Sequence, residues 1–259
     1  MSRLGLAIDY IYYYYSSVNK HGVHSPFVYK LVTEVINAPT PLDIKTPIEN
    51  RRSKLKKSNS TIEFEDFGAK PGVYTKRVAD IANRALKPPK YAQLIYRLVH
   101  HFQPTIAIEL GTSLGITTLY QAAAMQQGTL YTLDGSNEVL KIAQEGFKET
   151  ETRTTINSIA GNFDDTLPEL LNQLDEVDYV YFDGNHRKAP TLDYFKQCLK
   201  KAHNNSFFIF DDINWSAEMK EAWEEIKNHP QVTVTIDLFF IGLVFFRKEQ
   251  EKEHFKIRF

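Results

Sequence analysis

The sequence predicts an α/β protein built on a doubly wound, mostly parallel β-sheet of seven strands. Short β-branched runs alternate with segments of helical period from residue 105 to residue 228, as βαβ units require. The two apolar runs that follow are joined by almost no connecting sequence, so they must pair as antiparallel neighbours. We therefore expect the sheet to end in a C-terminal antiparallel hairpin and to carry an N-terminal helical appendage.

The composition is typical of one such domain with an appendage. Of the 259 residues, 42% are hydrophobic and 13% are aromatic, which is enough to bury a sizeable core. The net charge of -1 creates no global field that would recruit nucleic acid or an anionic membrane. The single cysteine, Cys198, excludes an internal disulfide framework, and we interpret the chain as a cytoplasmic protein.

Residues 1–60 predict a helical appendage followed by a basic linker. Helices are expected at 4–16 and 25–36, where Ser25 is an N-cap and Pro26 suits the first turn. The tyrosines of 12–15 cannot all face one side of a helix, so some must meet the main domain, another subunit or a substrate. Residues 39–60 are polar and hold six basic residues, which predicts a linker or a mobile loop.

Neither long apolar run predicts a membrane span. The run 4–15 is interrupted by Asp9 and is not followed by a small-residue cleavage site, which argues against a signal peptide. The run 232–246 contains Asp237 and is shorter than the roughly 20 residues that a bilayer requires. We expect no membrane partner.

The main domain is assigned to residues 61–259. Gly68, Pro71 and Gly72 predict a tight loop ahead of a helix at 73–86, and two prolines then break the chain before another helix. The expected strands are 105–109, 129–134, 155–160, 179–183, 207–211, 232–240 and 242–248. Besides the helix that follows the first strand, the expected helices are 92–102, 138–149, 166–174, 191–201 and 217–228.

The stretch TIAIELGTSLGITTLY, residues 105–120, gives the clearest indication of a ligand site. A β-branched run changes to helical spacing at Gly111, so a strand turns into a helix there. Gly111 and Gly115 let the backbone approach a ligand, while Thr112 and Ser113 are N-cap candidates for the helix. A glycine pair alone also occurs in ordinary βα turns, so the interpretation depends on the neighbouring residues.

Two carboxylates beside this turn favour a nucleoside that carries positive charge. Glu109 ends its strand on the side where α/β proteins bind ligands, and Asp134 ends the next strand, where ribose hydroxyls are bound. The turn lacks the G-x-G-x-x-G spacing that a dinucleotide needs, and Glu109 would repel a pyrophosphate. S-adenosylmethionine, with its ammonium and sulfonium groups, satisfies both observations.

The motif ELGTSLG resembles the first motif of class I S-adenosylmethionine-dependent methyltransferases, most closely the catechol and caffeoyl-CoA O-methyltransferase branch. The resemblance covers roughly residues 91–247 and implies a Rossmann-like sheet. It implies that Glu109 binds the ammonium, Asp134 the ribose and the GNF segment at 161–163 the adenine, although a plain turn with a buried Phe explains GNF nearly as well. The expected cofactor-binding residues are Glu109, Gly111, Thr112, Ser113, Gly115, Asp134, Gly135, Ser136, Gly161, Asn162, Phe163 and Asp183.

Three carboxylates form a second candidate site. Asp183 ends the fourth strand, and Asp211 and Asp212 end the fifth; neighbouring strands lie about 4.8 Å apart, close enough for both ends to share a Mg²⁺-like cation. The resemblance implies a divalent metal between an Asp and an Asp-Asn pair, and this sequence has Asp-Asp in the second place. The alternatives are that Asp212 caps the next helix, or that repulsion raises one carboxyl pKa.

His186 is the candidate general base. It stands where the related enzymes carry a lysine that takes the proton of the acceptor hydroxyl, and an imidazole suits that task near neutral pH. We expect His186 and Asp183 to be catalytic. Arg187 and Lys188 stay open as alternatives, and Trp215 either walls an acceptor pocket or packs against the sheet.

The sequence thus predicts transfer of a methyl group from S-adenosylmethionine to an oxygen of a small-molecule acceptor, with assistance from a divalent cation such as Mg²⁺. The alternative is a non-catalytic binding protein on the same fold that associates with nucleic acid through the basic run 45–57. That run has no aromatic residue to stack on bases, so we do not expect nucleic acid as a partner. The acceptor atom, oxygen or nitrogen, and a homodimeric state remain open.

Overall fold

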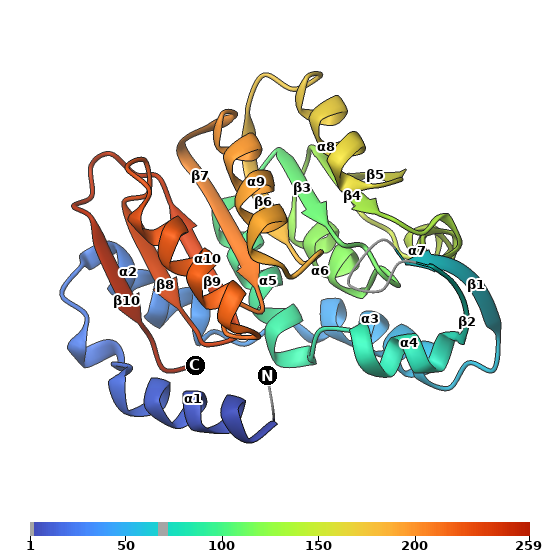
Figure 1. Cartoon of the computed structure of the whole chain (residues 1–259), viewed down its shortest axis with the longest axis horizontal. Helices are drawn as coiled ribbons and strands as arrows, with labels where there is room; N and C mark the ends of the chain where they lie inside the picture. Colours follow the sequence, from blue (N-terminus) through green and yellow to red (C-terminus); the bar gives the residue numbers. More distant parts are fainter. Residues whose placement is uncertain (1–2, 67–71) are drawn as a thin grey trace. The chain divides into compact units, whose positions relative to one another are not determined.

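The computed structural model describes residues 3–66 and 72–259, and the expected loop at Gly68 and Pro71 falls partly outside them. The chain divides into two compact units, one formed by residues 38–172 and the other by residues 1–37 and 173–259. Each unit combines strands with helices (Figure 1). The domain boundary expected near residue 60 stays a prediction.

The unit of residues 38–172 contains three parallel strands with helices between them. β4 pairs in parallel with β3 on one side and with β5 on the other. The bounds are α3 Leu42–Lys56, β1 Thr61–Asp66, β2 Gly72–Arg77, α4 Val78–Ala85, α5 Pro89–Phe102, β3 Ile106–Leu110, α6 Ile116–Ala124, β4 Thr129–Asp134, α7 Asn137–Glu149, β5 Thr155–Ala160 and α8 Phe163–Leu171. The strand-to-helix change expected at Gly111 is confirmed, because β3 ends just before it and α6 begins at Ile116.

The polar segment expected to be a linker forms helix α3 instead, so that prediction is wrong. Arg52 is buried and donates to Glu49 Oε2 at 2.8 Å and to the carbonyl of Lys87 at 2.7 Å. Arg51 donates to the carbonyl of Ile142 in α7 at 2.6 Å, and the Tyr120 hydroxyl of α6 donates to Glu49 at 2.9 Å. These hydrogen bonds to other parts of the chain stabilise α3, whose polar sequence has no apolar period that would predict a helix.

The helix expected at 73–86 begins later than predicted. Its first residues form β2, which pairs antiparallel with β1, and the helix proper is α4. Arg77 makes two hydrogen bonds to Asp80, at 3.1 and 3.0 Å, across the first turn of that helix.

The second unit contains five strands in the order β10-β8-β9-β7-β6. β6 and β7 are parallel, β9 is antiparallel to both β7 and β8, and β10 is parallel to β8. The bounds are α1 Arg3–Ser16, a 3₁₀ turn Lys20–Gly22, α2 Pro26–Leu31, a π-helical turn Val32–Ile36, β6 Val177–Phe182, α9 Lys188–Leu199, β7 Ala202–Asp211, α10 Ala217–Asn228, β8 Val234–Asp237, β9 Ile241–Phe245 and β10 Glu253–Lys256.

The predicted fold class is confirmed. The strands are mostly parallel and alternate with helices, and β8 and β9 form the expected C-terminal antiparallel hairpin. Beyond the seven strands that were expected, the described residues form β10 and the two strands of the β1–β2 hairpin. Along the described residues, no helix has both the length and the apolar character that crossing a bilayer would require.

Candidate functional site

The turn after β3 adopts a backbone that only certain residues allow. Gly111, Ser113 and Gly115 have φ angles of 107°, 49° and 77°, in the left-handed region that favours glycine. At Gly115 an added Cβ would lie 2.9 Å from the Cβ of Ala143 and 2.8 Å from the ring of Phe147, both in α7. The glycines of ELGTSLG therefore serve a tight turn that packs on the following helix.

Asp134 fastens this turn to the one after β4. Its Oδ2 accepts a hydrogen bond from the N–H of Ser113 at 2.7 Å, and its Oδ1 accepts one from the N–H of Ser136 at 2.9 Å. Ser136 also caps α7 by accepting from the N–H of Val139 at 3.3 Å. The carboxylate and Gly135 are half-buried, so a ligand can reach them. The first cofactor residues predicted from sequence thus lie together at one edge of the strands.

Helix α6 begins without the caps that the sequence suggested. Its N-cap is Gly115, and no described side chain accepts a hydrogen bond from its first turn. Thr112 is buried, and its hydroxyl lies 2.5 Å from that of Thr132, so the expected capping role is wrong. The unsatisfied N–H groups of a helix N-terminus attract anions, so the start of α6 could bind a carboxylate group of a ligand.

Glu109 lies beneath the turn, where its side chain is fully buried. Its Oε2 accepts from Thr118 at 2.5 Å and from Thr132 at 2.6 Å, and its Oε1 accepts from Gln121 at 2.5 Å. Burial raises the pKa of this carboxyl to about 7, and the three donors offset the rise only in part. Direct contact with a ligand ammonium would require the turn to open, so Glu109 as it stands supports the turn.

Two threonine hydroxyls connect Glu109 to the turn. Thr132 has one hydroxyl proton and donates it to Glu109, so Thr112 must be the donor in the 2.5 Å contact between the two hydroxyls. The buried carboxylate therefore sets the orientation of the Thr112 side chain. Sequence reasoning missed Thr118, Gln121 and Thr132; the i,i+3 spacing of the first two on α6 was the available signal.

The GNF segment follows β5 and lies beside Asp134. The N–H of Gly161 donates to the carbonyl of Asp134 at 3.0 Å. Asn162 caps α8, because its Oδ1 accepts from the N–H of Asp164 at 3.2 Å, and Phe163 is half-buried. The segment is thus a capped turn with an accessible ring, and its contact with adenine stays a prediction.

The second group of predicted residues lies in the other unit, at the carboxyl ends of β6 and β7. Asp183, His186 and Asp211 have ligand atoms that all lie within 4.8 Å of one another. His186 Nε2 is 3.7 Å from Asp183 Oδ1, which is too long for a hydrogen bond. Asp211 is buried, while the other two side chains are half-buried. Two carboxylates and one imidazole therefore face one small volume.

Tyr181 is a member of this group that sequence reasoning missed. Its hydroxyl donates to Asp183 Oδ2 at 2.9 Å. Burial, together with the charges of Asp183 and Asp211, raises the pKa of Tyr181 far above its usual range, so the hydroxyl keeps its proton and remains a donor. Its position two residues before Asp183 along the strand direction was the available signal, because such residues share a face.

Asp212 takes a different place from the one expected. Its φ is 53°, and its carbonyl accepts a hydrogen bond from the N–H of Trp215 at 2.9 Å in a turn. The cluster whose ligand atoms lie within 4.8 Å of one another contains His186 together with Asp183 and Asp211, and Asp212 is not a member. Ser216 caps α10, so the alternative that Asp212 is the cap is wrong. Trp215 is 54% exposed, so more than half of its surface is not packed against the sheet. A role for Asp212 as a metal ligand stays a prediction.

The alternatives to His186 as the base have other partners. The Lys188 ammonium lies 2.9 Å from Glu221 and 2.7 Å from Glu225, and hydrogen bonds to these carboxylates raise its pKa. A protonated lysine cannot accept a proton. Arg187 is exposed and donates to Asn185 Oδ1 at 2.7 Å. Of these three basic residues, His186 is the one that lies with Asp183 and Asp211.

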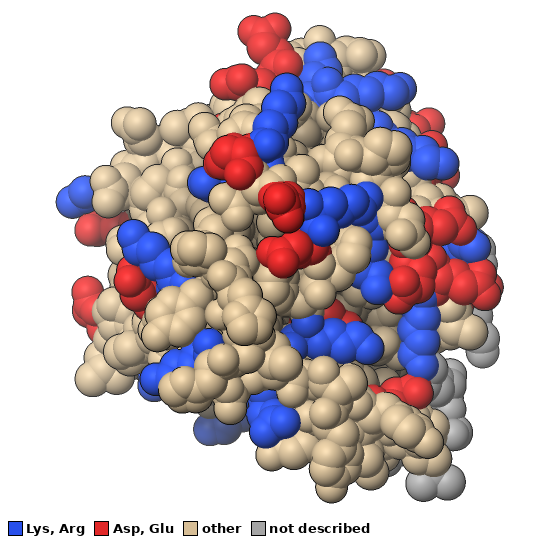
Figure 2. All heavy atoms as spheres, turned by 90° about the vertical axis from the view of Figure 1, so that its left-hand side faces the viewer, with Lys and Arg blue, Asp and Glu red and all other residues tan. Residues whose placement is uncertain are grey.

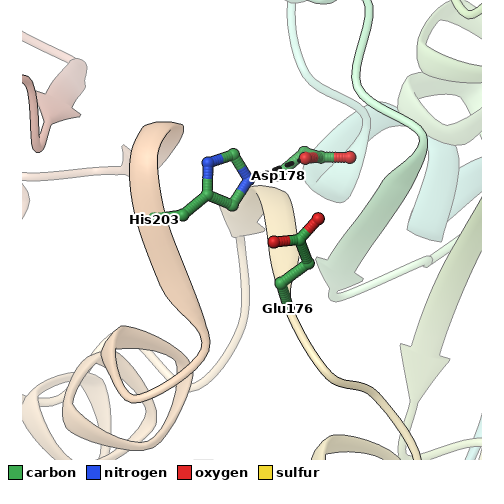
Figure 3. Close-up of side chains that lie close together, drawn as sticks. All are labelled: Glu176, Asp178 and His203. Atoms are coloured by element: carbon green, nitrogen blue, oxygen red, sulfur yellow. Dashed lines mark hydrogen bonds and ion pairs between the residues drawn. The ribbon is translucent and has the colours of Figure 1, made fainter.

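A second histidine cluster lies at the opposite, amino ends of the same two strands. Glu176, Asp178 and His203 have ligand atoms within 4.8 Å of one another, and the imidazole points toward Asp178 (Figure 3). His203 Nε2 lies 2.8 Å from Asp178 Oδ1, and Nδ1 accepts from the N–H of Asn205 at 3.2 Å. Because Nδ1 accepts, the neutral ring carries its proton on Nε2 and donates it to Asp178. Neither nitrogen is then available to a metal.

Comparison with known proteins covers the segment that holds both groups of predicted residues. Residues 108–213 match a family profile described as a methyltransferase domain. This segment is similar to a methyltransferase domain. The matched segment contains every predicted site residue, from Glu109 to Asp212.

Named relatives agree with this assignment. The O-methyltransferase hkm8 of Aspergillus hancockii is 26% identical over 126 residues, which are 47% of this chain and 49% of that protein. The match to this chain thus spans about half the length of this relative. The predicted resemblance to S-adenosylmethionine-dependent O-methyltransferases is confirmed.

Solved structures share the fold. The O-methyltransferase TomG of Streptomyces achromogenes, in complex with SAM, is 18% identical, with a TM-score of 0.55 over 63% of this chain and 82% of that one. The Bacillus cereus O-methyltransferase in complex with SAH is 16% identical, with a TM-score of 0.58 over 84% and 96%. SAH-bound PaMTH1 of Podospora anserina is 14% identical, with a TM-score of 0.59 over 82% and 91%.

Proposed function

We propose that this methyltransferase domain transfers a methyl group from S-adenosylmethionine to an oxygen of a small-molecule acceptor in the cytoplasm. The observation that carries the proposal is the pair of hydrogen bonds by which Asp134 joins the turn after β3 to the turn after β4. That pair sets a carboxylate, an uncapped helix N-terminus and left-handed glycines side by side. The Asp134 carboxylate suits the ribose of S-adenosylmethionine, and the helix N-terminus suits its carboxylate. The glycines let the ligand come close to the backbone.

Each residue of the cofactor site has a separate task. Asp134 accepts hydrogen bonds from the ribose hydroxyls, and the first N–H groups of α6 bind the methionine carboxylate. Phe163 contacts the adenine ring. Glu109 keeps the turn in shape through Thr132 and Thr112. S-adenosylmethionine supplies an electrophilic methyl group on its sulfonium, so the protein needs few reactive groups of its own.

A divalent cation fits the group formed by Asp183, His186 and Asp211. Their ligand atoms share one volume, and Tyr181 orients one carboxylate by donating to it. Within this group the two carboxylates would hold the cation, and their oxygen ligands suit Mg²⁺ or Mn²⁺. The imidazole of His186 would then stay available as a base. Such a cation would lower the pKa of an acceptor hydroxyl.

The chemical step places His186 as the base. The acceptor hydroxyl gives its proton to His186 Nε2, and the oxygen lone pair forms a bond to the methyl carbon. The carbon–sulfur bond breaks at the same time, its electron pair remains on sulfur, and the product is S-adenosylhomocysteine. The Asp183 carboxylate, 3.7 Å from Nε2, stabilises the imidazolium that forms.

The non-catalytic alternative is association with nucleic acid through 45–57, and two of the six basic residues in that run have other partners. Arg51 and Arg52 of that run are engaged in bonds within their own unit. Figure 2 shows acidic and basic side chains intermixed on one face of the molecule, the left-hand side of Figure 1. A small acceptor is therefore the better partner, and a salt-dependent complex with RNA would contradict this choice.

Calorimetry with S-adenosylhomocysteine tests the cofactor site. We expect binding in the micromolar range, about −8 kcal/mol. Asp134→Ala should weaken it by about 1.5 to 3 kcal/mol, because hydrogen bonds to a charged group are lost. Asp178→Ala, a carboxylate of similar size in the other unit, is the matched control and should bind normally. Absence of heat with folded wild-type protein would contradict the proposal.

A further inference from the structure

Helix α1 has two apolar faces, and one of them is open. Ile8, Ile11, Tyr12 and Tyr15 recur at i, i+3, i+4 and i+7, so they share one stripe. Their side chains are 46%, 54%, 73% and 83% exposed. Tyr13 points the other way and is buried. A stripe of this width is what a helix normally buries against another element.

The packed face of α1 holds this stripe in a fixed position. The Tyr13 hydroxyl donates to the carbonyl of Ile257 near the C-terminus. Arg258 donates to the carbonyl of Tyr14 at 2.9 Å, and its guanidinium lies 4.0 Å from the centre of the Tyr14 ring. A surface that is already ordered loses little conformational entropy when it binds a partner.

The stripe is complementary to itself. Its order, Ile-x-x-Ile-Tyr-x-x-Tyr, places an isoleucine opposite a tyrosine when two copies of α1 run antiparallel. Ile8 would then face the partner's Tyr15, and Ile11 would face the partner's Tyr12. No charged residue lies in the stripe, and Asp9 forms an ion pair with Lys220 at 2.5 Å on another side of the helix. A two-fold interface brings each patch against its own copy, so the absence of charge removes repulsion.

The exposed area suits a second copy better than a lipid surface. With about 150 to 250 Å² for each tyrosine and somewhat less for each isoleucine, the four side chains expose on the order of 500 Å². Two copies would bury on the order of 1,000 Å², the lower bound for a specific interface. A helix that binds anionic membranes needs a lysine- and arginine-rich face, whereas Arg3 is the single basic residue of α1.

We propose that two copies of this chain associate through antiparallel pairing of their α1 helices about a two-fold axis. The interface stands apart from methyl transfer, because none of the proposed cofactor or acceptor residues lies on α1. Wild-type protein at about 50 μM should sediment as a dimer of the 29.9 kDa chain. Tyr12→Asp places two like charges near the axis and should raise the dissociation constant at least tenfold.

Tyr29→Ser, which changes an exposed tyrosine on α2, is the matched control and should leave the dimer intact. Mixing Tyr12→Asp with Tyr12→Lys should restore dimers, which distinguishes a lost interface from a lost fold. A wild-type monomer at this concentration, or a dimer unaffected by Tyr12→Asp, would overturn the proposal.

Cross-linking tests the direction of the pair. Ile8 and Tyr15 are about 10.5 Å apart along one helix, beyond the roughly 7 Å limit for a disulfide, so cysteines at both positions cannot react within one copy. The double variant Ile8→Cys/Tyr15→Cys should therefore give a covalent dimer on oxidation, and Ile8→Cys alone should not. The native Cys198 is buried and does not compete. Equal cross-linking by the single variant, or none by the double, would contradict the antiparallel pair.

Discussion

β6 and β7 carry a histidine-carboxylate cluster at each end, and the two clusters differ in how their hydrogen bonds are used. At the amino ends, His203 donates to Asp178 and accepts from the backbone of Asn205, so both ring nitrogens have partners within the fold. At the carboxyl ends, His186 lies 3.7 Å from Asp183 and makes no hydrogen bond to it. Residue types alone would rank the clusters equally.

The difference shows that a candidate site is identified by whether its hydrogen-bond donors and acceptors already have partners within the fold. A histidine with two committed nitrogens can move a proton or bind a metal only after an existing bond breaks. A histidine near carboxylates at the ligand side of parallel strands has no such cost. We therefore propose that the carboxyl ends, with Asp183, are reactive and that the amino ends, with Asp178, support the structure.

Asp183→Asn should give the largest loss. The variant keeps the size of the side chain and can still accept from Tyr181, but it removes the charge that stabilises the His186 imidazolium. We expect kcat/KM for methyl transfer to fall at least 100-fold, about 3 kcal/mol. Glu176→Gln, the corresponding change at the amino ends, should stay within twofold of wild type. Equal losses would remove the distinction between the two ends.

The histidines should differ in the kind of loss they cause. His186→Ala should lower kcat by about 10² to 10³, the scale of general base catalysis, while S-adenosylhomocysteine binds as before. His203→Ala should leave kcat unchanged and lower the free energy of unfolding by about 1 kcal/mol, because the partly buried hydrogen bond to Asp178 is lost. Kinetics and urea denaturation of both variants provide the check, and a larger kinetic effect at His203 would reverse our assignment.

Metal binding can be measured without activity. Mn²⁺ bound to the protein speeds the relaxation of water protons, and we expect this signal in the wild type and after Glu176→Gln. Asp211→Asn should weaken it at least tenfold, because one of two carboxylate ligands loses its charge. A signal that disappears with Glu176→Gln and persists with Asp211→Asn would place the cation at the amino ends of β6 and β7 and contradict our assignment.

The buried carboxyl of Glu109 offers a smaller effect, on stability. Burial raises its folded pKa to about 7, above the ordinary value of 4.5, so its contribution is complete below that ordinary value and is lost as pH rises through 7. Glu109→Gln cannot titrate. The unfolding free energy of the wild type relative to this variant should therefore fall by about 2 kcal/mol between pH 5 and pH 8. A constant difference would mean that Glu109 titrates normally.

The sequence predicted the parts of the fold that a repeating pattern encodes. The strand-to-helix change at Gly111 and the hairpin of β8 and β9 follow from apolar period and connection length, and both are present. Helix α3 was missed because its stability comes from Arg52 and Glu49, which bond to groups far along the chain. Such tertiary contacts leave no periodic trace in the sequence.

For the site, the sequence could indicate which residues lie near a strand end and could not show where their atoms point. Asp183 and Asp211 were predicted from their positions, and they do lie together. Glu109 points inward because Thr118 and Gln121 of α6 donate hydrogen bonds to it. Lys188 forms an ion pair because α10 places Glu221 beside it. Orientation of this kind is decided by neighbours from other elements.

The central claim is that this chain transfers methyl groups with residues at the carboxyl ends of β6 and β7. The direct measurement supplies S-adenosylmethionine with an isotopically labelled methyl group and a panel of catechols, and follows the label by mass spectrometry. We predict labelled O-methyl product and S-adenosylhomocysteine in equal amounts from the wild type and Asp178→Asn, and at least 100-fold less from Asp211→Asn. Product formed at the same rate by all three proteins, or no product from wild type that binds S-adenosylhomocysteine, would contradict the claim.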